Sequence, residues 1–374
     1  AAAGGADGPW AAYLKGGGDV PEAARPRLGL PPQRSAAGPP PLLHEVVDAV
    51  LAPGVPGVYV DATFGRGAYS AELLRRLPPS SRLIILADAR ANPSSCAAAR
   101  ALMREDTRVA DVIPKAFHEA GPSLAGMELA GIVLDLGVAF QHQGEEANRG
   151  FSPIDDVPLD LRLDPSEGVP ADAWLSSASV SELAWVLHAY GEDDDPLTAL
   201  RVAEAIMDRW RRRGPCRTVY QLVEVVRRAK GALDERGLHP ARLTLQALRV
   251  FLNGDLEKLG AFLEDAMSLL AVGGRLAVVT TRRPEAATVK AFMRSRENPH
   301  PLLESASSAQ RLSELYPLLQ ADTPFAVVQA SEPLWPSSAL GQRGPRSLAC
   351  HVLQRTRRRQ PQEGGDARLP ARGA

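Results

Sequence analysis

The stretch Tyr59–Ser70 reads YVDATFGRGAYS and joins the end of an apolar run to an acid and two glycines. The run, GVYVDAT, is rich in β-branched residues and begins at a glycine, so it predicts a buried strand that ends near Asp61. Gly65 and Gly67 predict a tight turn, and the residues from Ser70 onward predict a helix. In open α/β sheets, a turn of this kind lies where ligands bind. The stretch therefore indicates either a ligand-binding loop or a plain turn of the chain.

The residue types of this loop argue against a phosphate ligand. A dinucleotide fingerprint needs a third glycine where Ser70 stands, and a triphosphate loop needs a Gly-Lys-Ser/Thr sequence, which is absent. The carboxylate of Asp61 would also repel a pyrophosphate. It suits a ligand that carries an ammonium group or sugar hydroxyls, and S-adenosylmethionine carries both.

A second acid lies at the end of the next apolar run. The segment RLIILAD predicts a strand, and it ends on Asp88. A carboxylate in this position can accept hydrogen bonds from both hydroxyls of a ribose. The alternative is that Asp61 and Asp88 only cap helices, and this alternative remains open at this point.

Alternation of helices with buried strands predicts the fold class. Apolar strands are expected in GVYVDAT, RLIILAD, LAGIVLDLGV and GGRLAVVTT, with helical segments between them, which is typical of an α/β protein with a Rossmann-like parallel sheet. Between residues 148 and 237 the sequence contains helical patterns and no strong strand. We therefore expect a doubly wound domain that is interrupted by an inserted helical subdomain.

The expected boundaries divide the 374 residues into four parts. Residues 1–41, rich in Ala, Gly and Pro, are expected to be a disordered or presequence-like extension. Residues 42–147 and 238–354 form the discontinuous α/β domain, residues 148–237 form the helical domain, and residues 355–374 form a flexible tail. If the extension is the remnant of a presequence, the protein is expected in a mitochondrion or plastid, and otherwise in the cytoplasm.

Composition excludes several classes of protein. A net charge of −1 gives no overall attraction to nucleic acid or membrane, although arginines cluster between residues 209 and 217 and could contact RNA locally. The three cysteines are far apart, so neither a metal site nor a disulfide framework is expected. No apolar run is long enough to cross a membrane. The sequence does not indicate an oligomeric state.

Ten stretches of the chain, in order, resemble the bacterial and organellar family that methylates N4 of a cytidine in small-subunit ribosomal RNA, the MraW/RsmH-type methyltransferases. The stretches are PLLHEVVDAV, GVYVDATFGRGAYS, GIVLDLGV, NRGFS, PLDLRLDPSEGVPADAWL, YGED, HPARLTLQALRVFLNGDLEKL, GGRLAVV, VKAFM and GPRSLA. The resemblance implies a class I S-adenosylmethionine-dependent methyltransferase fold with an inserted helical domain that recognises the substrate. It implies S-adenosyl-L-methionine as the cofactor and small-subunit rRNA, or the small ribosomal subunit, as the partner, without a metal or a membrane.

The resemblance also implies roles for individual residues. The cofactor-binding positions would be Asp61, Gly65, Arg66, Gly67, Asp88, Phe117, Asp135 and Gln143. Among them, Asp88 would hold the ribose and Phe117 would lie beside the adenine. Asp135, in the DLG motif, would lie at the reactive end of the cofactor and act as the catalytic residue by accepting an N–H of the target amine.

The chain departs from the family in three places. The family's SFHSLEDR segment is replaced by TTRRPEAA at residues 280–287, with only Glu285 in register. The glutamine after the DLG motif is matched by Gln141 or Gln143. In the loop that reads GRGGHS in the family, Ala68 and Tyr69 replace the third glycine and the histidine. These changes leave a second hypothesis, a catalytically weakened homologue that binds the ribosome or assists its assembly. A nucleotide-dependent oxidoreductase is a third, which the missing glycine disfavours.

Overall fold

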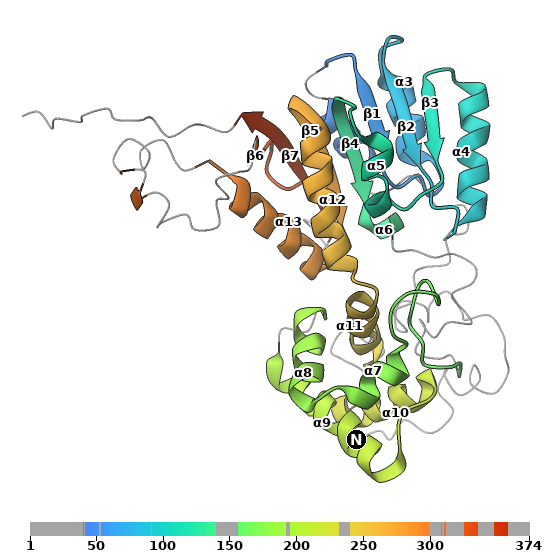
Figure 1. Ribbon diagram of the computed structural model, residues 1–374, viewed down its shortest axis with the longest axis vertical. Coiled ribbons are helices and arrows are strands. Elements are labelled where there is room, and N and C mark those ends of the chain that lie inside the picture. The colour runs from blue at the N-terminus through green and yellow to red at the C-terminus, as the bar shows by residue number, and fades with distance from the viewer. Residues whose placement is uncertain are drawn as a thin grey trace, which may run out of the picture.

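The computed structural model describes residues 40, 42–51, 54–90, 92–139, 156–191, 195–231, 240–298, 308, 310–311, 325–335 and 348–357. It contains a sheet domain and a helical domain that lie end to end (Figure 1). The predicted site residue Gln143 and the aromatic residues Phe140 and Phe151 lie outside the described residues.

Seven strands form one sheet in the order β3-β2-β1-β4-β5-β7-β6. The strands are β1 (Val58–Asp61), β2 (Arg82–Leu86), β3 (Val109–Ile113), β4 (Leu129–Asp135), β5 (Leu270–Thr280), β6 (Phe325–Gln329) and β7 (Ala349–Arg357). The first five are parallel, whereas β7 enters antiparallel between β5 and β6. The order reverses between β1 and β4, so the switch point lies beside the YVDATFGRGAYS loop. The expected Rossmann-like class I methyltransferase sheet is confirmed.

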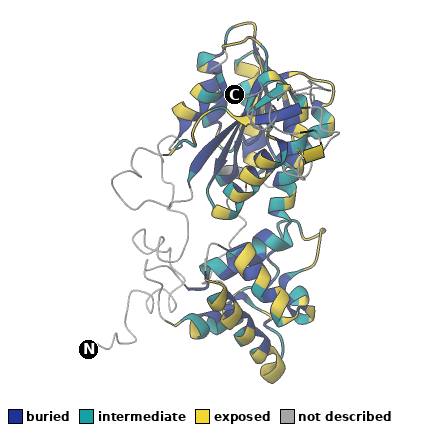
Figure 2. Cartoon of the chain, turned by 90° about the vertical axis from the view of Figure 1, so that its left-hand side faces the viewer, coloured by how far each residue is buried: buried dark blue, intermediate teal, exposed yellow. Residues whose placement is uncertain are grey.

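Helices cover both faces of the sheet. In the part of the chain that the structure describes, the helices beside the strands are α2 (Leu43–Leu51), which precedes β1, and α3 (Ala68–Arg76), α4 (Pro93–Glu105), the 3₁₀ turn η3 (Phe117–Glu119), α5 (Gly121–Leu124), α6 (Leu136–Ala139) and α13 (Arg283–Arg296), which follow it. Apolar side chains of α2, α3 and α4 form one core with Tyr59, Leu83 and Val133 of the strands. Their sequence neighbours Val60, Ile84 and Ile132 face the opposite core. This alternation follows from the two-residue period of a strand, and it buries both faces of the sheet (Figure 2).

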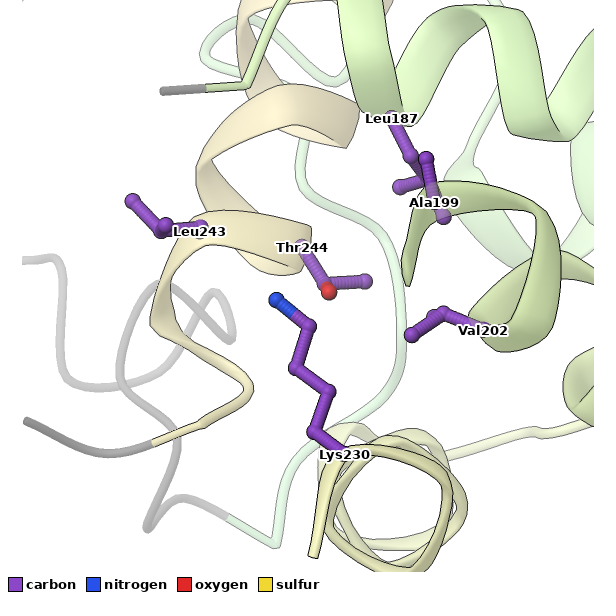
Figure 3. A pocket seen from close by; sticks show the side chains of 6 residues that line it. All are labelled: Leu187, Ala199, Val202, Lys230, Leu243 and Thr244. Atoms are coloured by element: carbon purple, nitrogen blue, oxygen red, sulfur yellow. The ribbon is translucent and has the colours of Figure 1, made fainter. Parts of the chain in front are cut away.

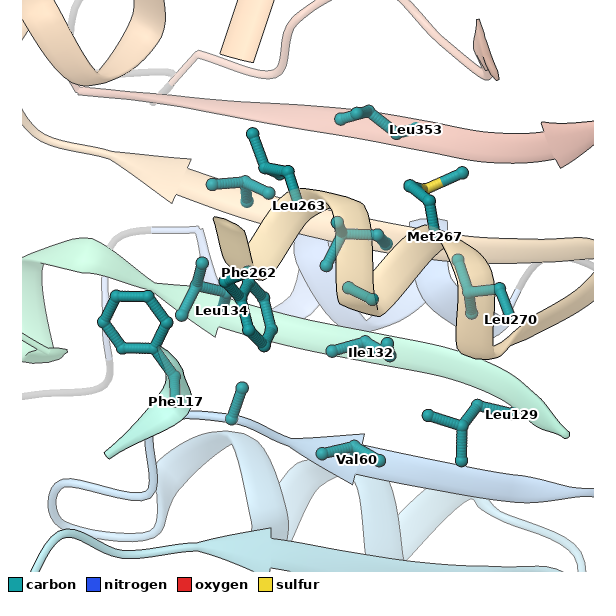
Figure 4. Close-up of a cluster of buried hydrophobic side chains, with 14 of the residues drawn as sticks. Val60, Phe117, Leu129, Ile132, Leu134, Phe262, Leu263, Met267, Leu270 and Leu353 are labelled. Atoms are coloured by element: carbon teal, nitrogen blue, oxygen red, sulfur yellow. The ribbon is translucent and has the colours of Figure 1, made fainter. Parts of the chain in front are cut away.

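The second face of the sheet is covered by α12 (Asp255–Leu269), together with α13 and η3. Phe262 of α12 meets Phe117 of η3 edge to face, with ring centroids 5.2 Å apart. Figure 4 shows both rings above Leu134 of β4. Because α12 ends where β5 begins, at the edge where β4 also begins, the first turn of α12 lies at the carboxyl edge of the sheet.

The chain between β4 and α12 builds the helical domain. Its helices are α7 (Ala171–Ser177), α8 (Val180–Ala189), α9 (Pro196–Arg213), α10 (Val219–Lys230) and α11 (Arg242–Leu252). They enclose a separate core that contains no strand residue. α11 and α12 are two separate helices, because the chain turns at Asn253 and at Gly254, whose φ is +61°.

Asn253, at the end of α11, fastens the loop at residues 161–163 to the helical domain. Its side-chain oxygen accepts from the Leu163 amide at 2.7 Å, and its Nδ2 donates to the Leu161 carbonyl at 2.9 Å. Leu161 is fully buried and has a φ of +63°, a conformation that is costly for a branched residue. A further hydrogen bond, from the Tyr190 hydroxyl to Glu257 at 2.8 Å, ties α8 to α12.

Two expected boundaries are wrong. The helical domain was expected to end at residue 237, but α11 (Arg242–Leu252) packs into the core of that domain. The flexible tail was expected to start at Arg355, but β7 continues to Arg357, and residues 355–357 pair with β6. The Arg355 side chain is held in place, because its Nη1 donates to the carbonyls of Ser268 and Leu270 and its guanidinium lies over the Phe325 ring, 5.5 Å from the centroid.

Candidate functional site

The loop after β1 turns sharply around two glycines. Gly65 and Gly67 have φ values of +54° and +82°, and Gly67 forms the N-terminal cap of α3. A Cβ atom on Gly67 would lie 2.8 Å from the Phe64 ring, so both conformation and space require glycine there. The Ser95 hydroxyl of α4 donates to the Gly65 carbonyl at 2.8 Å and fixes the turn. Arg66, between the glycines, is exposed.

Asp61 holds this loop through hydrogen bonds that its carboxylate accepts. Its carboxylate is fully buried, accepts from the Ser70 hydroxyl at 2.6 Å and accepts from the Thr63 amide at 3.1 Å. Burial raises the pKa of Asp61 to about 6, although the hydrogen bonds from Ser70 and Thr63 oppose the rise. Ser70, which replaces a glycine of the dinucleotide pattern, is thus the residue that connects α3 to the acid.

Asp135 ends β4, two residues beyond Val133, which pairs with Asp61. Its amide donates to the Thr63 hydroxyl at 2.8 Å, and its Oδ1 accepts from the Gly137 amide at 2.8 Å. The buried Tyr69 adjoins it: burial raises the pKa of the Tyr69 phenol, and the charge of Asp135 and a side-chain hydrogen bond to it act in the same direction. The structure therefore brings the two predicted acids, Asp61 and Asp135, to one place through Thr63. Neither Thr63 nor Tyr69 was singled out as a partner of Asp135 by the sequence.

Asp88 and Phe117 lie at the carboxyl ends of β2 and β3. Asp88 accepts from the Arg90 amide at 2.9 Å, and its side chain is 26% exposed at the edge of the sheet. Phe117 is 5% exposed and belongs to the core. The next residue, His118, has a buried Nδ1 without a hydrogen-bond partner among the described residues, and burial lowers its pKa. A neutral imidazole with an unmatched nitrogen is thus placed beside Phe117.

The donor set at this edge fits a nucleoside cofactor without a pyrophosphate. The carboxylate of Asp88 can accept from hydroxyls, and the ring of Phe117 and the unmatched nitrogen of His118 can meet a purine. The loop itself offers a phosphate only backbone amides and the exposed Arg66, with the buried acid of Asp61 beneath them. These observations agree with the ligand class that the sequence favoured.

The altered segment that follows β5 forms the start of α13 next to Asp135. The Glu285 carboxylate is 2% exposed and accepts from the amides of Thr281 at 2.8 Å and Arg282 at 3.0 Å. Thr281 packs against the loop of β4, since a Cβ on Gly137 would lie 2.8 Å from its methyl group. Glu285 therefore holds the first turn of the helix, which gives a structural reason for an acid at this position.

Asp255, the first residue of α12, is an acid that sequence analysis missed. It is 1% exposed, and burial raises its pKa to about 6, against the positive charges of Arg249, Arg282 and Lys258. No periodic signal could have found it, because an acid after a glycine is the usual start of a helix and is usually solvated.

The helical domain carries an exposed basic end and a small cavity. Arg211, Arg212 and Arg213 are exposed at the end of α9, beside Trp210, which is 37% exposed. The cavity lies between helices α8, α9, α10 and α11, where Lys230 points its amine toward Thr244 (Figure 3). Trp174 and Tyr190 both pack on Phe251 within the helical domain.

Within the described ranges, no three His, Cys, Asp or Glu side chains gather where they could hold a metal ion. None of the helices that the structure describes combines the length and the apolar character needed to span a membrane.

Comparison with known proteins gives one consistent result. The sequence model of the MraW methylase family matches residues 38–316. The ribosomal RNA small subunit methyltransferase H of Bordetella avium is 37% identical over 328 residues, which cover 86% of this chain and 87% of the relative. The protein of the same name from Bordetella petrii is 40% identical over 272 residues, or 68% of this chain and 72% of the relative.

Among solved structures, an rRNA methylase from Streptococcus thermophilus aligns over 84% of this chain and 94% of its own, with 9% identity and a TM-score of 0.34. That likeness is too distant to add to the sequence matches. The family match covers the glycine loop, the helical domain, strands β1 to β5 and the segment at 280–287, and it ends before β6 and β7. On this evidence the chain belongs to the MraW methylase family.

Proposed function

We propose that this protein is an S-adenosylmethionine-dependent methyltransferase that acts on N4 of a cytidine in small-subunit ribosomal RNA. The observation that carries the proposal is the buried Asp135 at the end of β4, joined through Thr63 to the glycine loop of a MraW-family chain. The printed names of the relatives support small-subunit rRNA as the substrate class. The choice of cytidine N4 rests on the resemblance of the motifs.

The cofactor would lie across the carboxyl ends of β1, β2 and β4. Asp88 would accept hydrogen bonds from its ribose hydroxyls, and Phe117 and His118 would border its adenine. The turn at Gly65–Gly67 would allow the cofactor to come close to the backbone. When bound, S-adenosylmethionine supplies a methyl group made electrophilic by the sulfonium. Asp61 would keep the loop in shape rather than touch the ligand, because its carboxylate is fully buried and bonded within the loop.

The contribution of Asp135 would be orientation of the target amine. The lone pair on N4 of cytosine is delocalised into the ring, so the amine is a weak nucleophile. A carboxylate that accepts one N–H concentrates electron density on the nitrogen and fixes its direction, which is largely a proximity effect. The Gly137 amide and Tyr69 hold this carboxylate in one orientation. The helical domain would supply RNA contacts, for which the exposed arginines at the end of α9 are suited.

Two measurements test the proposal. Calorimetry should detect binding of S-adenosylmethionine to the folded protein, and Asp88→Ala should weaken that binding. Sequencing of small-subunit rRNA for N4-methylcytidine, with and without the gene, should reveal one site that disappears with the gene. Folded protein that fails to bind the cofactor would refute the proposal.

A second function is suggested by the sequence TTRRPEAA at residues 280–287, which differs from the SFHSLEDR segment that the resemblance leads us to expect there. The protein would then bind the small subunit without transferring a methyl group. Retained ribosomal binding together with an unchanged set of methylated cytidines would support this alternative.

A further inference from the structure

Helix α13 carries a line of positive charge on its exposed side. The exposed residues of this helix are Arg283, Ala287, Lys290, Ala291 and Arg294. At about 3.6 residues per turn, the three cations lie within roughly 40° of one another around the helix axis. The line from the first cation to the last is about 16 Å long, at a rise of about 1.5 Å per residue. Together Arg283, Lys290 and Arg294 form the basic face of α13.

The opposite side of α13 packs against the sheet. Val289, Phe292 and Met293 belong to the core on that side, and the buried Arg296 is paired with Glu264 of α12. These apolar and ionic contacts fix the rotation of the helix about its axis. The basic face is therefore held toward solvent as a constant feature of the fold.

The charge of the basic face is not compensated by neighbouring acids. The exposed side of the helix contains no Asp or Glu, and Glu285, the acid of the first turn, is buried and accepts from two amides. Among the residues that the structure describes, neither Lys290 nor Arg294 forms an ion pair, whereas the inward-facing Arg296 does. Solvated cations of this kind can neutralise the charges of a polyanion and release its counterions.

The basic face begins beside the proposed active site. Asp135 pairs with Val279 across β4 and β5, and Arg283 comes four residues after Val279. Between them, Thr281 packs on Gly137, whose amide donates to Asp135. From there α13 runs beside α12 and past β6 and β7 (Figure 1). A polyanion that follows the basic face would thus reach the edge of the sheet where Asp135 lies.

We propose that the basic face of α13 binds the phosphate backbone of the RNA strand that carries the target base. This inference rests on the proposed function and adds an RNA contact on the sheet domain, apart from the arginines of α9. Phosphate contacts position a nucleic acid on a protein without reading its sequence. Here they would hold the strand so that the target base is presented to Asp135.

The shape of the surface suits a linear polyanion. Cations arranged in a line along a helix can each meet a successive charge of a strand, whereas a single anionic group needs cations that converge on one point. Ala287 and Ala291 are small, so the strand can come close to the helix between the cations. The exposed side of α13 has no large apolar residue, which a helix that lies on a membrane surface would need.

Helix α4 offers a matched control. Arg100 and Arg104 are exposed on it and are four residues apart, as are Lys290 and Arg294. They also form no ion pair among the described residues, but α4 packs on β3, at the other end of the sheet. Replacing either pair by glutamine removes two positive charges from one exposed helix, so the two variants differ in the position of the change.

The experiment measures binding of the full chain to a fifteen-nucleotide oligouridylate with one central cytidine, over a series of salt concentrations. For a single strand, each phosphate contact contributes about 0.7 to the slope of log K against log salt. Lys290→Gln with Arg294→Gln should therefore make the slope shallower by about 1.4. The loss of affinity relative to the wild type should then widen about 7-fold as the salt falls from about 200 to about 50 mM.

Two variants should keep the wild-type slope. Arg100→Gln with Arg104→Gln removes the same charge elsewhere, and Lys290→Arg with Arg294→Lys keeps both charges of the basic face. All of these substitutions are exposed, so the midpoint of urea unfolding should stay near that of the wild type.

An unchanged slope after Lys290→Gln with Arg294→Gln overturns the inference, and so does an equal change in the α4 control or a wild type that does not bind the RNA at the lowest salt. The proposed function fails separately. A wild type that shows the expected slopes but methylates no small-subunit rRNA refutes the methyl transfer and leaves the RNA-binding face intact. A wild type that methylates the rRNA while the slope ignores the basic face refutes this inference alone.

Discussion

Replacing Asp255 by asparagine should make the protein more stable, and increasingly so as the pH rises. The folded-state pKa of Asp255 is raised from its ordinary value of 3.8 to about 6, mainly by burial. A group with a raised folded-state pKa favours the fold while it is protonated, and this contribution is lost as the pH rises through the folded-state value. Asparagine has nearly the same shape and never acquires the charge.

The magnitude follows from the two pKa values. Each pKa unit corresponds to about 1.4 kcal/mol, so the ionised carboxylate costs the fold roughly 3 kcal/mol at pH 8 relative to a neutral side chain. At pH 5 the unfolded chain is already ionised and the folded protein is not, and the cost is then roughly 1 to 2 kcal/mol by the same linkage relation. The advantage of the variant should therefore grow by roughly 1 kcal/mol between these two pH values.

Urea unfolding of the wild type, Asp255→Asn and Asp265→Asn at pH 5 and pH 8 measures this difference directly. Because the variants are compared with the wild type at each pH, titration of all other groups cancels, provided that Arg249, Arg282, Lys258 and Glu285 keep their positions around residue 255. The control, Asp265→Asn, should stay within about 0.5 kcal/mol of the wild type, as is usual for exposed substitutions. A variant that is less stable than the wild type at pH 8, or whose advantage does not change with pH, would refute the reasoning.

Three further predictions concern the remaining parts of the site. Glu285→Ala removes the acceptor of two amides at the start of α13 and should lower the free energy of unfolding by roughly 2–4 kcal/mol, measured by urea titration; a loss below 0.5 kcal/mol, on the scale of a neutral surface change, would contradict the capping role. Gly67→Ala places a Cβ against Phe64 in a left-handed conformation and should cost about 1–2 kcal/mol, with weaker cofactor binding in calorimetry; unchanged binding would show that the turn does not shape the site. Asp135→Asn should leave cofactor affinity within a few-fold and reduce the rate of methyl transfer by roughly 10²-fold or more; full activity would remove Asp135 from the mechanism.

The sheet could be predicted largely because four of its strands are buried on both faces. The runs at 58–61, 82–86, 129–135 and 270–280 are apolar and β-branched, and each one is found in the structure. Strand β3, with the sequence VADVI, was not predicted, because two of its five residues are exposed at the edge of the sheet and break the apolar run. Strands β6 and β7 were also missed, since a polar and basic C-terminal segment resembles a tail until its pairing with β5 is known.

The residues of the candidate site also fall into those that the sequence could predict and those that it could not. Asp61, Asp88 and Asp135 could be found because each ends an apolar strand, and the parallel sheet brings such ends together. Their partners Thr63, Ser70 and Tyr69 could be identified only from the structure of the turn, because the hydrogen bonds across it depend on the conformations of Gly65 and Gly67. Asp255 could not be found from the sequence, because its burial results from the packing of α12 against elements about thirty residues or more away, and a local pattern contains no information about that packing.

The antiparallel position of β7 has a consequence for the order in which the protein becomes able to work. β7 pairs with β5 over residues 275–280, and Thr280 immediately precedes the segment that carries Thr281 and Arg282. While the chain is being synthesised, everything up to α13 can emerge and begin to pack, but β5 keeps an open edge until residue 357 is available. A nascent chain therefore has its glycine loop and its helical domain long before β7 pairs with β5 and fixes the segment with Thr281 and Arg282. A protein whose proposed substrate is part of a ribosome would thus gain a finished site only after its own synthesis has passed residue 357.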